Sequence, residues 1–400
     1  MDTLVRAGML YPVTSPPIEN GWLLLRGGRI ARIGGGEPPR ADGVIDLSGH
    51  LVMPGLINAH CHLQFTAARG TMPRGDFMEW VAAAIAYSSK TSVDEMLRGV
   101  EEGVEELLTS GTTAAGDIVS LPAVAAKVAR SPLRTVLFVE TIALHAAGEE
   151  AAWRQCLALL ESAKNAGGRI GLAPHGPHTV APQYFSHLFQ YAREEGIPIT
   201  SHVAESPEEN IFIAKGEGPF RALMNERGAL VDSFNGCGKS PVMLIREQRA
   251  LERLLAAHLN EVDEKDIAAL IAAKAIPVFC PGSSRWFGRK KVMPLDRFIA
   301  AGLAPCLGTD SAASNDSLSM LDELRAAREY YPTIPVERLV EAVTINGARA
   351  LGLECGALET GMWADIAAFP PCGGSPLDAL FAAKEASFVM VGGKVIRNIA

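Results

Sequence analysis

The chain has 400 residues, 48% of them hydrophobic and 20% charged, an ordinary globular balance that allows a large buried core. Its net charge of −8 argues against nucleic acid as a partner, because phosphate recognition needs clustered lysine and arginine. No signal-peptide pattern opens the sequence, no run approaches the roughly 18 apolar residues that span a bilayer, and the seven cysteines form no CxxC pair, so we expect a cytoplasmic protein with reduced thiols and no membrane contact.

The first fifty residues are typical of short strands joined by tight turns. Residues 22–26 and 29–33 are apolar runs separated by two glycines, which indicates a β-hairpin. The last fifty residues show the same pattern, with apolar runs at 365–369, 387–391 and 394–396. Neither end has enough strands to bury one face alone. We therefore predict one small β-domain formed by residues 1–52 together with residues 356–400.

Between these ends, strand and helix patterns alternate. Short β-rich runs occur at eight places: 55–60, 112–119, 134–141, 169–174, 197–203, 254–259, 276–280 and 303–308. Helical stretches such as 93–109 and 183–195 separate most of them. Eight strands that alternate with helices predict a (β/α)8 TIM barrel over residues 53–355, with an inserted helix or loop over the site within 206–250. A doubly wound sheet is the competing architecture, but the sequence has no GxGxxG or GxxxxGK[ST] motif to support nucleotide binding.

Several side chains that bind metals well fall at the C-terminal ends of predicted strands, namely His60, His62, His202, His258 and Asp310. In a barrel these strand ends form the active-site face. His60 and His62 are two residues apart, so on a strand their side chains point the same way. Three imidazoles and a carboxylate suit zinc or a similar divalent ion, and the set predicts a metal-dependent hydrolase. We expect the other three histidines to be surface or structural residues rather than metal ligands: His50, His145 and His187.

These residues lie in segments that resemble a known family. The runs PGLINAHCH at 54–62, HVAE at 202–205 and LGTDS at 307–311 resemble the amidohydrolase superfamily. Within it they are similar to the branch that contains cytosine, guanine and S-adenosylhomocysteine deaminases and the triazine chlorohydrolases. The likeness covers nearly the whole chain, since residues 356–365 resemble the family's return into a β-sandwich. The resemblance thus implies that the β-domain of both termini is a small sandwich.

The resemblance also implies roles for the site residues. The ligands of one divalent metal ion would be His60, His62, His202 and Asp310, with Zn²⁺ favoured and Fe²⁺ accepted by the same set. Binuclear members carry a carboxylated lysine or a glutamate at the fourth strand, and residues 171–175 have neither, which favours a single ion.

A bound metal would lower the pKa of water from about 15.7 towards 7. Asp310 would accept the proton of this water, and His258 would orient or polarise at the metal-bound water. Glu205 would be the proton shuttle that protonates a ring nitrogen and then the departing ammonia. The catalytic residues predicted in this way are Glu205, His258 and Asp310.

Candidate substrate contacts follow the first, fourth and seventh predicted strands. His175 and His178 close the fourth strand, where family members often carry Pro-His-x-Pro-Tyr, so that His178 departs from the common form. Trp80 lies after the first strand, and its ring suits stacking on a flat heterocycle. Arg74 and Arg285 lie on similar loops and suit an anionic group of the substrate.

The predicted reaction is hydrolysis of a C–N bond other than a peptide bond, with release of ammonia from an aminated heterocycle. S-adenosylhomocysteine deaminases hold the ribose diol with an acid that residues 81–91 lack, while residues 69–75 look more like aminodeoxyfutalosine deaminases. The favoured substrate is therefore a 6-aminopurine nucleoside such as aminodeoxyfutalosine, or one of the S-adenosylhomocysteine and methylthioadenosine type. Alternatives are a chlorohydrolase, a guanine- or cytosine-type base deaminase, or another C–N hydrolase of this superfamily.

A non-catalytic binding protein with a relict site would lack a ligand or the shuttle acid, and neither is missing. The pattern leaves the native metal and the physiological substrate open. A homodimer is the default expectation for a soluble enzyme.

Overall fold

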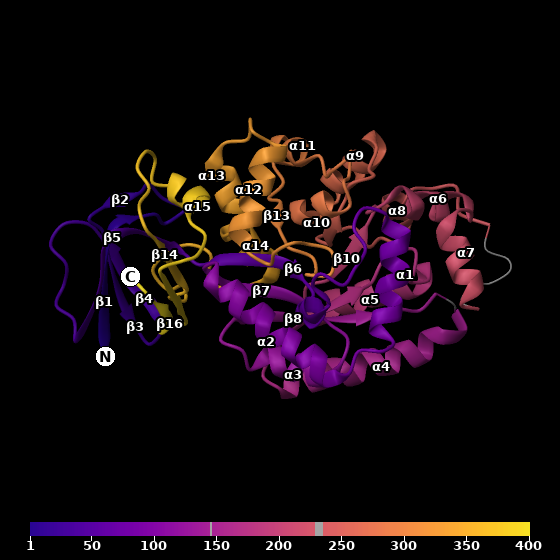
Figure 1. Cartoon of the computed structure of the whole chain (residues 1–400), viewed down its shortest axis with the longest axis horizontal. Helices are drawn as coiled ribbons and strands as arrows, with labels where there is room; N and C mark the ends of the chain where they lie inside the picture. Colours follow the sequence, from indigo (N-terminus) through magenta and orange to yellow (C-terminus); the bar gives the residue numbers. More distant parts are fainter. Residues whose placement is uncertain (145, 229–234) are drawn as a thin grey trace.

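The chain forms a sheet at one end of the molecule and a body of parallel strands and helices beside it (Figure 1). The computed structural model describes residues 1–144, 146–228 and 235–400. His145 therefore lies outside the described residues, as does part of the predicted insertion at 206–250. The content is mixed α/β.

The end sheet combines strands from both termini. Its order is β16-β15-β14-β5-β1-β3-β4, with β2 paired to β1. The two halves join through β5, which runs parallel to β1 and antiparallel to β14. Indigo and yellow strands accordingly lie side by side in Figure 1. The strands are β1 (Asp2–Leu10), β2 (Ile18–Glu19), β3 (Trp22–Arg26), β4 (Arg29–Gly34), β5 (Gly43–Pro54), β14 (Ile366–Phe369), β15 (Phe388–Val391) and β16 (Lys394–Asn398).

The body contains two four-stranded parallel sheets, in the orders β6-β7-β8-β9 and β10-β11-β12-β13. Isolated parallel bridges connect the two sheets at both edges, one between Leu172 and Ile199 and the other between Cys61 and Asp310. The strands are β6 (Leu56–Cys61), β7 (Thr112–Val119), β8 (Arg134–Thr141), β9 (Arg169–Pro174), β10 (Thr200–Val203), β11 (Leu255–His258), β12 (Ile276–Phe279) and β13 (Cys306–Leu307).

Helices follow most of these strands and cover the body. Three of them, α6 to α8, lie in the segment where an insertion was predicted. The helices are η1 (Leu63–Ala68, a 3-10 helix), α1 (Phe77–Ser88), α2 (Val93–Thr109), α3 (Pro122–Ala129), α4 (Ala146–Asn165), α5 (Pro182–Glu195), α6 (Pro207–Lys215), α7 (Pro219–Glu226), α8 (Pro241–Glu247), α9 (Glu264–Ala272), α10 (Pro281–Trp286), α11 (Leu295–Ala300), α12 (Met320–Tyr330), α13 (Val336–Ala342), α14 (Ile345–Leu351) and α15 (Asp378–Ala382).

The strand predictions match the structure closely in three places, where β7, β8 and β9 have the predicted bounds. β10 and β13 are shorter than predicted. Each is preceded closely by a proline, Pro198 before β10 and Pro305 before β13. Proline has no N–H to donate to a strand ladder, so regular pairing begins only after it.

The first strand of the body is held where it ends. All six residues of β6 are buried, as expected for a parallel strand covered on both faces. The helix α2 packs closely on η1, because a Cβ at Gly103 would lie 2.7 Å from the Thr66 hydroxyl oxygen. The carboxylate of Asp117 on β7 accepts the Leu63 N–H at 2.8 Å. These contacts fix the turn that follows His60 and His62.

A buried ion pair connects the end sheet to the body. Asp365, which is 1% exposed, accepts hydrogen bonds from Nε and Nη2 of Arg134 at 2.7 and 3.0 Å. Its Oδ1 also accepts the Gly392 N–H at 2.6 Å. Arg134 begins β8, while Asp365 directly precedes β14 and Gly392 lies in the turn between β15 and β16 of the end sheet. The carboxylate therefore joins the two parts of the molecule.

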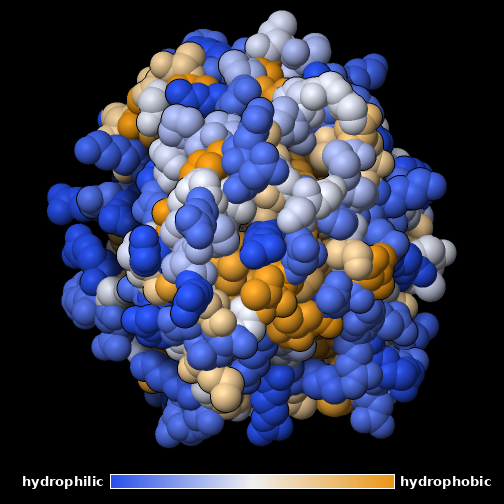
Figure 2. Space-filling model, turned by 90° about the vertical axis from the view of Figure 1, so that its left-hand side faces the viewer, coloured by the Kyte–Doolittle hydropathy of each residue, from blue (hydrophilic) through white to orange (hydrophobic). Residues whose placement is uncertain are grey.

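The face of the molecule that Figure 2 shows is mostly hydrophilic, with its largest apolar area near the middle and smaller apolar spots around it. Across the described ranges, no helix has the length and hydrophobicity needed to cross a membrane.

We expect Asp365→Ala to destabilise the protein by about 3–5 kcal/mol, because it leaves the Arg134 guanidinium and the Gly392 N–H without their acceptor. Denaturant unfolding followed by circular dichroism measures this change. Glu150→Ala is the matched control, since its pair with Arg154 is exposed on both sides, and it should leave the midpoint unchanged. Equal midpoints for both variants would contradict the role given to Asp365.

Candidate active site

The predicted metal-binding residues lie at the C-terminal ends of four strands. His60 is on β6 and His62 directly follows it, His202 is on β10 and His258 ends β11. Asp310 follows β13. All five side chains are buried, with exposed fractions from 1% to 8%. The structure thus brings all five residues to one place.

A backbone contact sets Asp310 against His60. The N–H groups of Thr309 and Asp310 both donate to the His60 carbonyl at 3.1 Å. The side chain of Asn58 spans the same contact, since its Oδ1 accepts the Thr309 N–H and its Nδ2 donates to the Thr309 hydroxyl at 2.7 Å. Gly308 permits the approach, because a Cβ there would lie 2.8 Å from the His60 carbonyl oxygen.

The imidazoles face one another at short range. Nε2 of His62 lies 3.3 Å from Nε2 of His202, and their rings are nearly parallel. The His60 ring is edge-on to the rings of His62, His202 and His258, with centroids 4.9 to 5.9 Å apart. Ligand atoms of His60, His202, His258 and Asp310 all lie within 4.8 Å of one another.

The two oxygens of the Asp310 carboxylate have different partners. Its Oδ2 accepts hydrogen bonds from the hydroxyls of Ser283 at 2.9 Å and Ser314 at 2.7 Å. Its Oδ1 instead faces the imidazoles, 3.6 Å from Nε2 of His62 and 3.9 Å from Nε2 of His60. One oxygen is therefore held by the protein while the other points into the cluster.

The charges of these groups are set by burial and by one another. Burial lowers the pKa of five imidazoles here, those of His60, His62, His175, His202 and His258. At His60 and His62 the neighbouring imidazoles lower the pKa further. Burial alone would raise the pKa of Asp310, but the histidines that face it hold it below its usual value. The cluster at neutral pH is thus a group of neutral imidazoles with one carboxylate.

This donor set fits a divalent metal ion. Nδ1 of His202 lies 2.7 Å from the His175 carbonyl, to which it donates its proton, so its Nε2 presents a lone pair to the cluster. Within the described part of the chain, Nε2 of His60 is buried without a hydrogen-bond partner. Buried polar atoms nearly always have a partner, and a cation at this point supplies one. Neutral imidazoles and a carboxylate are ligands that zinc accepts.

Glu205 lies beside the cluster. Its Oε2 is 3.7 Å from Nε2 of His258. Burial raises the pKa of Glu205 to about 7, against the lowering effect of Arg289. Its backbone is fixed from both sides, because its N–H donates to Glu209 at 2.8 Å and its carbonyl accepts from Asn260 at 3.2 Å. A carboxyl with such a pKa can give and take protons near neutral pH.

Backbone strain is concentrated at these strand ends. Ala204, His258 and Asp310 have positive φ angles of 51°, 74° and 60°. Residues other than glycine pay about 1–3 kcal/mol for such conformations, which persist where the surroundings enforce them and which cluster at functional sites. Here the chain turns at His258 and Asp310, whose side chains belong to the cluster, and at Ala204, directly before Glu205.

Trp80, His175 and His178 lie near the cluster or near the aromatic groups around it. The His175 ring is 4.9 Å from that of His202, and its Nδ1 is 2.8 Å from the Thr179 hydroxyl. His178 lies 3.7 Å from the Glu209 carboxylate. Trp80 is on α1 rather than in the loop predicted for it, and its indole N–H donates to the Ala313 carbonyl at 2.7 Å. The indole N–H is therefore already used within the protein.

The two predicted arginines have partners of their own. Arg74 forms an ion pair with Asp316 at 2.6 Å and lies over the Trp286 ring. Arg285 pairs with Glu329 at 2.6 Å, and its side chain is 47% exposed. These pairs occupy the charges that were predicted for an anionic group of the substrate.

Two charged residues were missed by the sequence reasoning. Glu209 accepts the N–H groups of Ala204 and Glu205 with its two oxygens and so shapes the turn that carries Glu205. Arg289 lies 3.9 Å from Glu205 with its side chain 9% exposed. The run Arg289-Lys290-Lys291 is typical of a solvated loop, and no sequence signal distinguishes the buried member.

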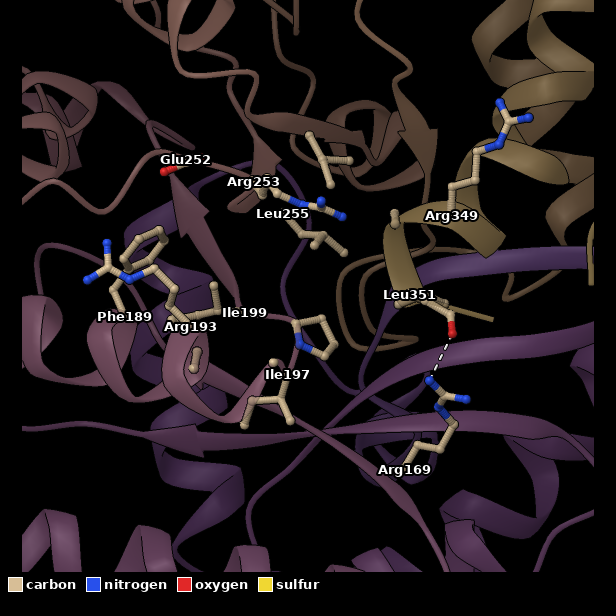
Figure 3. A pocket seen from close by; sticks show the side chains of 16 residues that line it. Arg169, Phe189, Arg193, Ile197, Ile199, Glu252, Arg253, Leu255, Arg349 and Leu351 are labelled. Atoms are coloured by element: carbon tan, nitrogen blue, oxygen red, sulfur yellow. Dashed lines mark hydrogen bonds between the residues drawn. The ribbon is translucent and has the colours of Figure 1, made fainter. Parts of the chain in front are cut away.

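A separate cavity of about 410 Å³ lies at the opposite ends of the strands (Figure 3). It is lined by the first residues of β9, β11 and β12, and none of the predicted site residues lines it. Arg193 and Arg349 point away from each other in Figure 3, and Arg169 donates to the Gly352 carbonyl at 2.8 Å. The cavity is therefore not part of the histidine cluster.

Comparisons with known proteins agree with this picture. The profile of the Amidohydrolase family matches residues 51–396. The chain is 30% identical over 382 residues to a 5-methylthioadenosine/S-adenosylhomocysteine deaminase of Moorella thermoacetica, covering 91% of this chain and 84% of that protein. Aminofutalosine deaminase of Helicobacter pylori, solved with methylthio-coformycin, has a similar fold, with a TM-score of 0.86, 22% identity and coverage of 98% and 100%. An adenosine deaminase from Xanthomonas campestris with bound zinc gives a TM-score of 0.85, 20% identity and coverage of 99% and 93%.

We expect the purified protein to bind about one divalent ion per chain, and we expect His60→Ala to lower that affinity by more than about 100-fold. The reason is that the removed imidazole contributes an Nε2 that has no other partner in the described residues. Elemental analysis after dialysis against a weak chelator measures the content. His187→Ala is the control, since His187 lies on α5 against Trp153, and it should keep its metal. Full occupancy in His60→Ala would refute a metal site at this cluster.

Proposed function

The chain belongs to the amidohydrolase family, and we propose that it is a metal-dependent deaminase that releases ammonia from a 6-aminopurine nucleoside. The observation that carries the proposal is the position of Glu205, a carboxyl that is 12% exposed and has a pKa of about 7, next to a cluster of neutral imidazoles and a carboxylate. The relatives named as 5-methylthioadenosine/S-adenosylhomocysteine deaminases and the aminofutalosine deaminase fold support this class of substrate.

The finer architecture that we infer is a closed (β/α)8 barrel over residues 53–355, with a small β-sandwich from residues 1–52 and 356–400. Two features support the barrel, namely the parallel order of the strands in both sheets and the bridges that connect the sheets at both edges. The joint sheet of both termini supports the domain boundaries. In this architecture all five metal-binding candidates lie on the face where barrel enzymes carry their sites.

We assign His60, His62, His202 and Asp310 as the metal ligands. The 3.3 Å between Nε2 of His62 and Nε2 of His202 is about the separation of two ligand atoms with bonds of about 2.0–2.1 Å in a tetrahedral site. Zinc is the favoured ion, because it accepts these donors and because the Xanthomonas campestris deaminase carries it. A bound divalent ion lowers the pKa of water from about 15.7 towards 7 and so supplies a nucleophile at neutral pH.

The proton transfers fall to the chain's own side chains. Asp310 takes the proton that the water loses, through the oxygen that the serine hydroxyls leave free. Glu205 protonates the ring nitrogen next to the reacting carbon, which makes that carbon more electrophilic. The Glu205 carboxylate then takes the second proton of the water from the hydroxyl group that has added to this carbon and delivers it to the departing amine, and the proton held by Asp310 restores Glu205 to its protonated form. His258 hydrogen-bonds to the oxygen that develops negative charge, since its free Nε2 faces the cluster and lies near Glu205.

Aromatic side chains form a wall near this acid. Phe77 and Trp80 on α1 are stacked at 6.0 Å, and the Phe287 ring is edge-on to both. A flat heterocycle packs well against such a surface. His175, which follows β9 and lies beside His202, is the polar candidate for a substrate contact. We therefore place the ring of the substrate between this wall and the histidine cluster.

We expect Glu205→Gln to lower kcat for ammonia release by about 10²- to 10⁴-fold with its metal content unchanged, because the amide cannot transfer the proton. The substrate panel is adenosine, 5′-methylthioadenosine, S-adenosylhomocysteine, aminodeoxyfutalosine, guanine, cytosine and an aminotriazine. Glu217→Gln, an exposed glutamate after α6, is the control and should be as active as the wild type. If the metal-loaded wild type releases no ammonia from any 6-aminopurine nucleoside, the proposed substrate class is wrong.

The ligand assignment has its own test. We expect His62→Ala to lose the metal, while His258→Ala keeps it and loses activity by at least about 100-fold, since only the former removes a ligand. Metal analysis and ammonia release on the same preparations separate the two effects. The reverse result, with metal lost from His258→Ala and kept by His62→Ala, would exchange the two roles.

A further inference from the structure

Arg289 is a buried cation with unused hydrogen-bonding groups. It follows α10, and its side chain is 9% exposed. The guanidinium carbon lies over the rings of Phe77 at 4.7 Å and Phe287 at 5.0 Å. Its Nε and Nη2 are buried, and neither has a hydrogen-bond partner in the ranges that the structure describes. The nearest charge, on Glu205, is 3.9 Å away, which is too far for a hydrogen bond.

Such an arrangement is costly unless something accepts these protons. A buried charged group needs hydrogen bonds as well as a counter-charge to offset its loss of water. Arg74 and Arg285, by contrast, donate to carboxylates at the surface. The aromatic rings around Arg289 also hold the guanidinium plane, so its donors are directed before anything binds.

The order of groups indicates what the donors meet. His258 faces Oε2 of Glu205, whereas Arg289 faces Oε1 of the same carboxylate. His258 belongs to the metal cluster, where the reacting carbon must lie. These groups therefore lie in the spatial order cluster, His258, Glu205, Arg289. On the substrate ring, the reacting carbon lies at the cluster and the nitrogen that is protonated lies at Glu205. The next acceptor along the same edge of the ring then lies at Arg289.

We propose that Arg289 recognises the substrate by donating from its buried guanidinium to the ring acceptor that lies beyond the nitrogen addressed by Glu205. In a 6-aminopurine this acceptor is N3, since N1 follows the reacting C6 and the intervening C2 carries only hydrogen. The inference rests on the proposed function for the identity of the ring. Arg289 is then a specificity-determining residue, which favours rings with an acceptor at that position and disfavours rings with a C–H or an amino group there.

The test combines a variant with an atom replacement in the substrate. Adenosine and 3-deazaadenosine differ only in N3, and kcat/KM is measured for both with the wild type and Arg289→Met. We expect Arg289→Met to lose about 10- to 100-fold on adenosine, the usual cost of removing a hydrogen bond from a charged donor, and less than about 3-fold on 3-deazaadenosine. Arg289→Lys keeps the positive charge but lacks the planar guanidinium with its several N–H donors. Its kcat/KM on adenosine should therefore lie between those of the wild type and Arg289→Met.

Each other outcome overturns the inference. An equal loss on both nucleosides means that Arg289 acts on Glu205 rather than on the substrate. An unchanged kcat/KM on both nucleosides means that Arg289 makes no contact that contributes to catalysis. Arg297→Met is the control, because Arg297 pairs with Glu264 on the surface, and it should match the wild type on both nucleosides. Should Arg289→Met fail to fold, as judged by circular dichroism and metal content, Arg289→Lys carries the same comparison.

A binding measurement separates this inference from the proposed reaction. Purine riboside has no amino group to release, and its dissociation constant is measured by calorimetry next to that of its 3-deaza analogue. Arg289→Met should weaken purine riboside by about 10- to 100-fold and leave the analogue unchanged. If the wild type deaminates no nucleoside but the two proteins show this difference in binding, the proposed reaction is wrong while the contact between Arg289 and the ring acceptor is supported. Equal binding by wild type and variant overturns the contact whatever the activity.

Discussion

The close contact between the ends of β6 and β13 is the constraint on which both the fold and the site depend. The His60 carbonyl accepts two successive N–H groups, and the absence of a side chain at Gly308 permits that approach. The contact joins the two parallel sheets at one edge. Because the same residues carry the imidazole of His60 and the carboxylate of Asp310, the fold cannot form here without placing the two side chains together. A change in the backbone at this point would alter both.

Much of this could be predicted from spacing alone. His60 and His62 share a face because strand side chains alternate, and the ends of parallel strands meet at one edge, which is why distant residues such as His202 and Asp310 converge. The strand β7 was predicted to the residue, and all of its residues are buried, as expected for a parallel strand covered on both faces. Periodicity and strand ends are properties of the backbone, and a sequence displays them directly.

Side-chain partners were harder to predict, and the arginines show why. Arg285, in the last turn of α10, and Arg289, just after that helix, are four residues apart and look alike in sequence. Yet Arg285 pairs with Glu329 in solvent, whereas Arg289 lies over phenylalanine rings with its side chain 9% exposed. The difference depends on where α12 and α1 pass, which local pattern does not contain. The turns at His258 and Asp310 were equally hidden, because tertiary contacts force conformations that the residues themselves disfavour.

The shared sheet of the two termini has a consequence for biosynthesis. β5 ends at Pro54 and its partner β14 begins at Ile366, so some three hundred residues must be translated before the edge of β5 can be paired. At about 5–20 residues per second this takes roughly 15–60 s. During that interval the nascent chain exposes an unpaired apolar strand edge, the kind of surface on which chains associate wrongly. The arrangement thus leaves the emerging N-terminal segment open to wrong association until the C-terminal strands have been made.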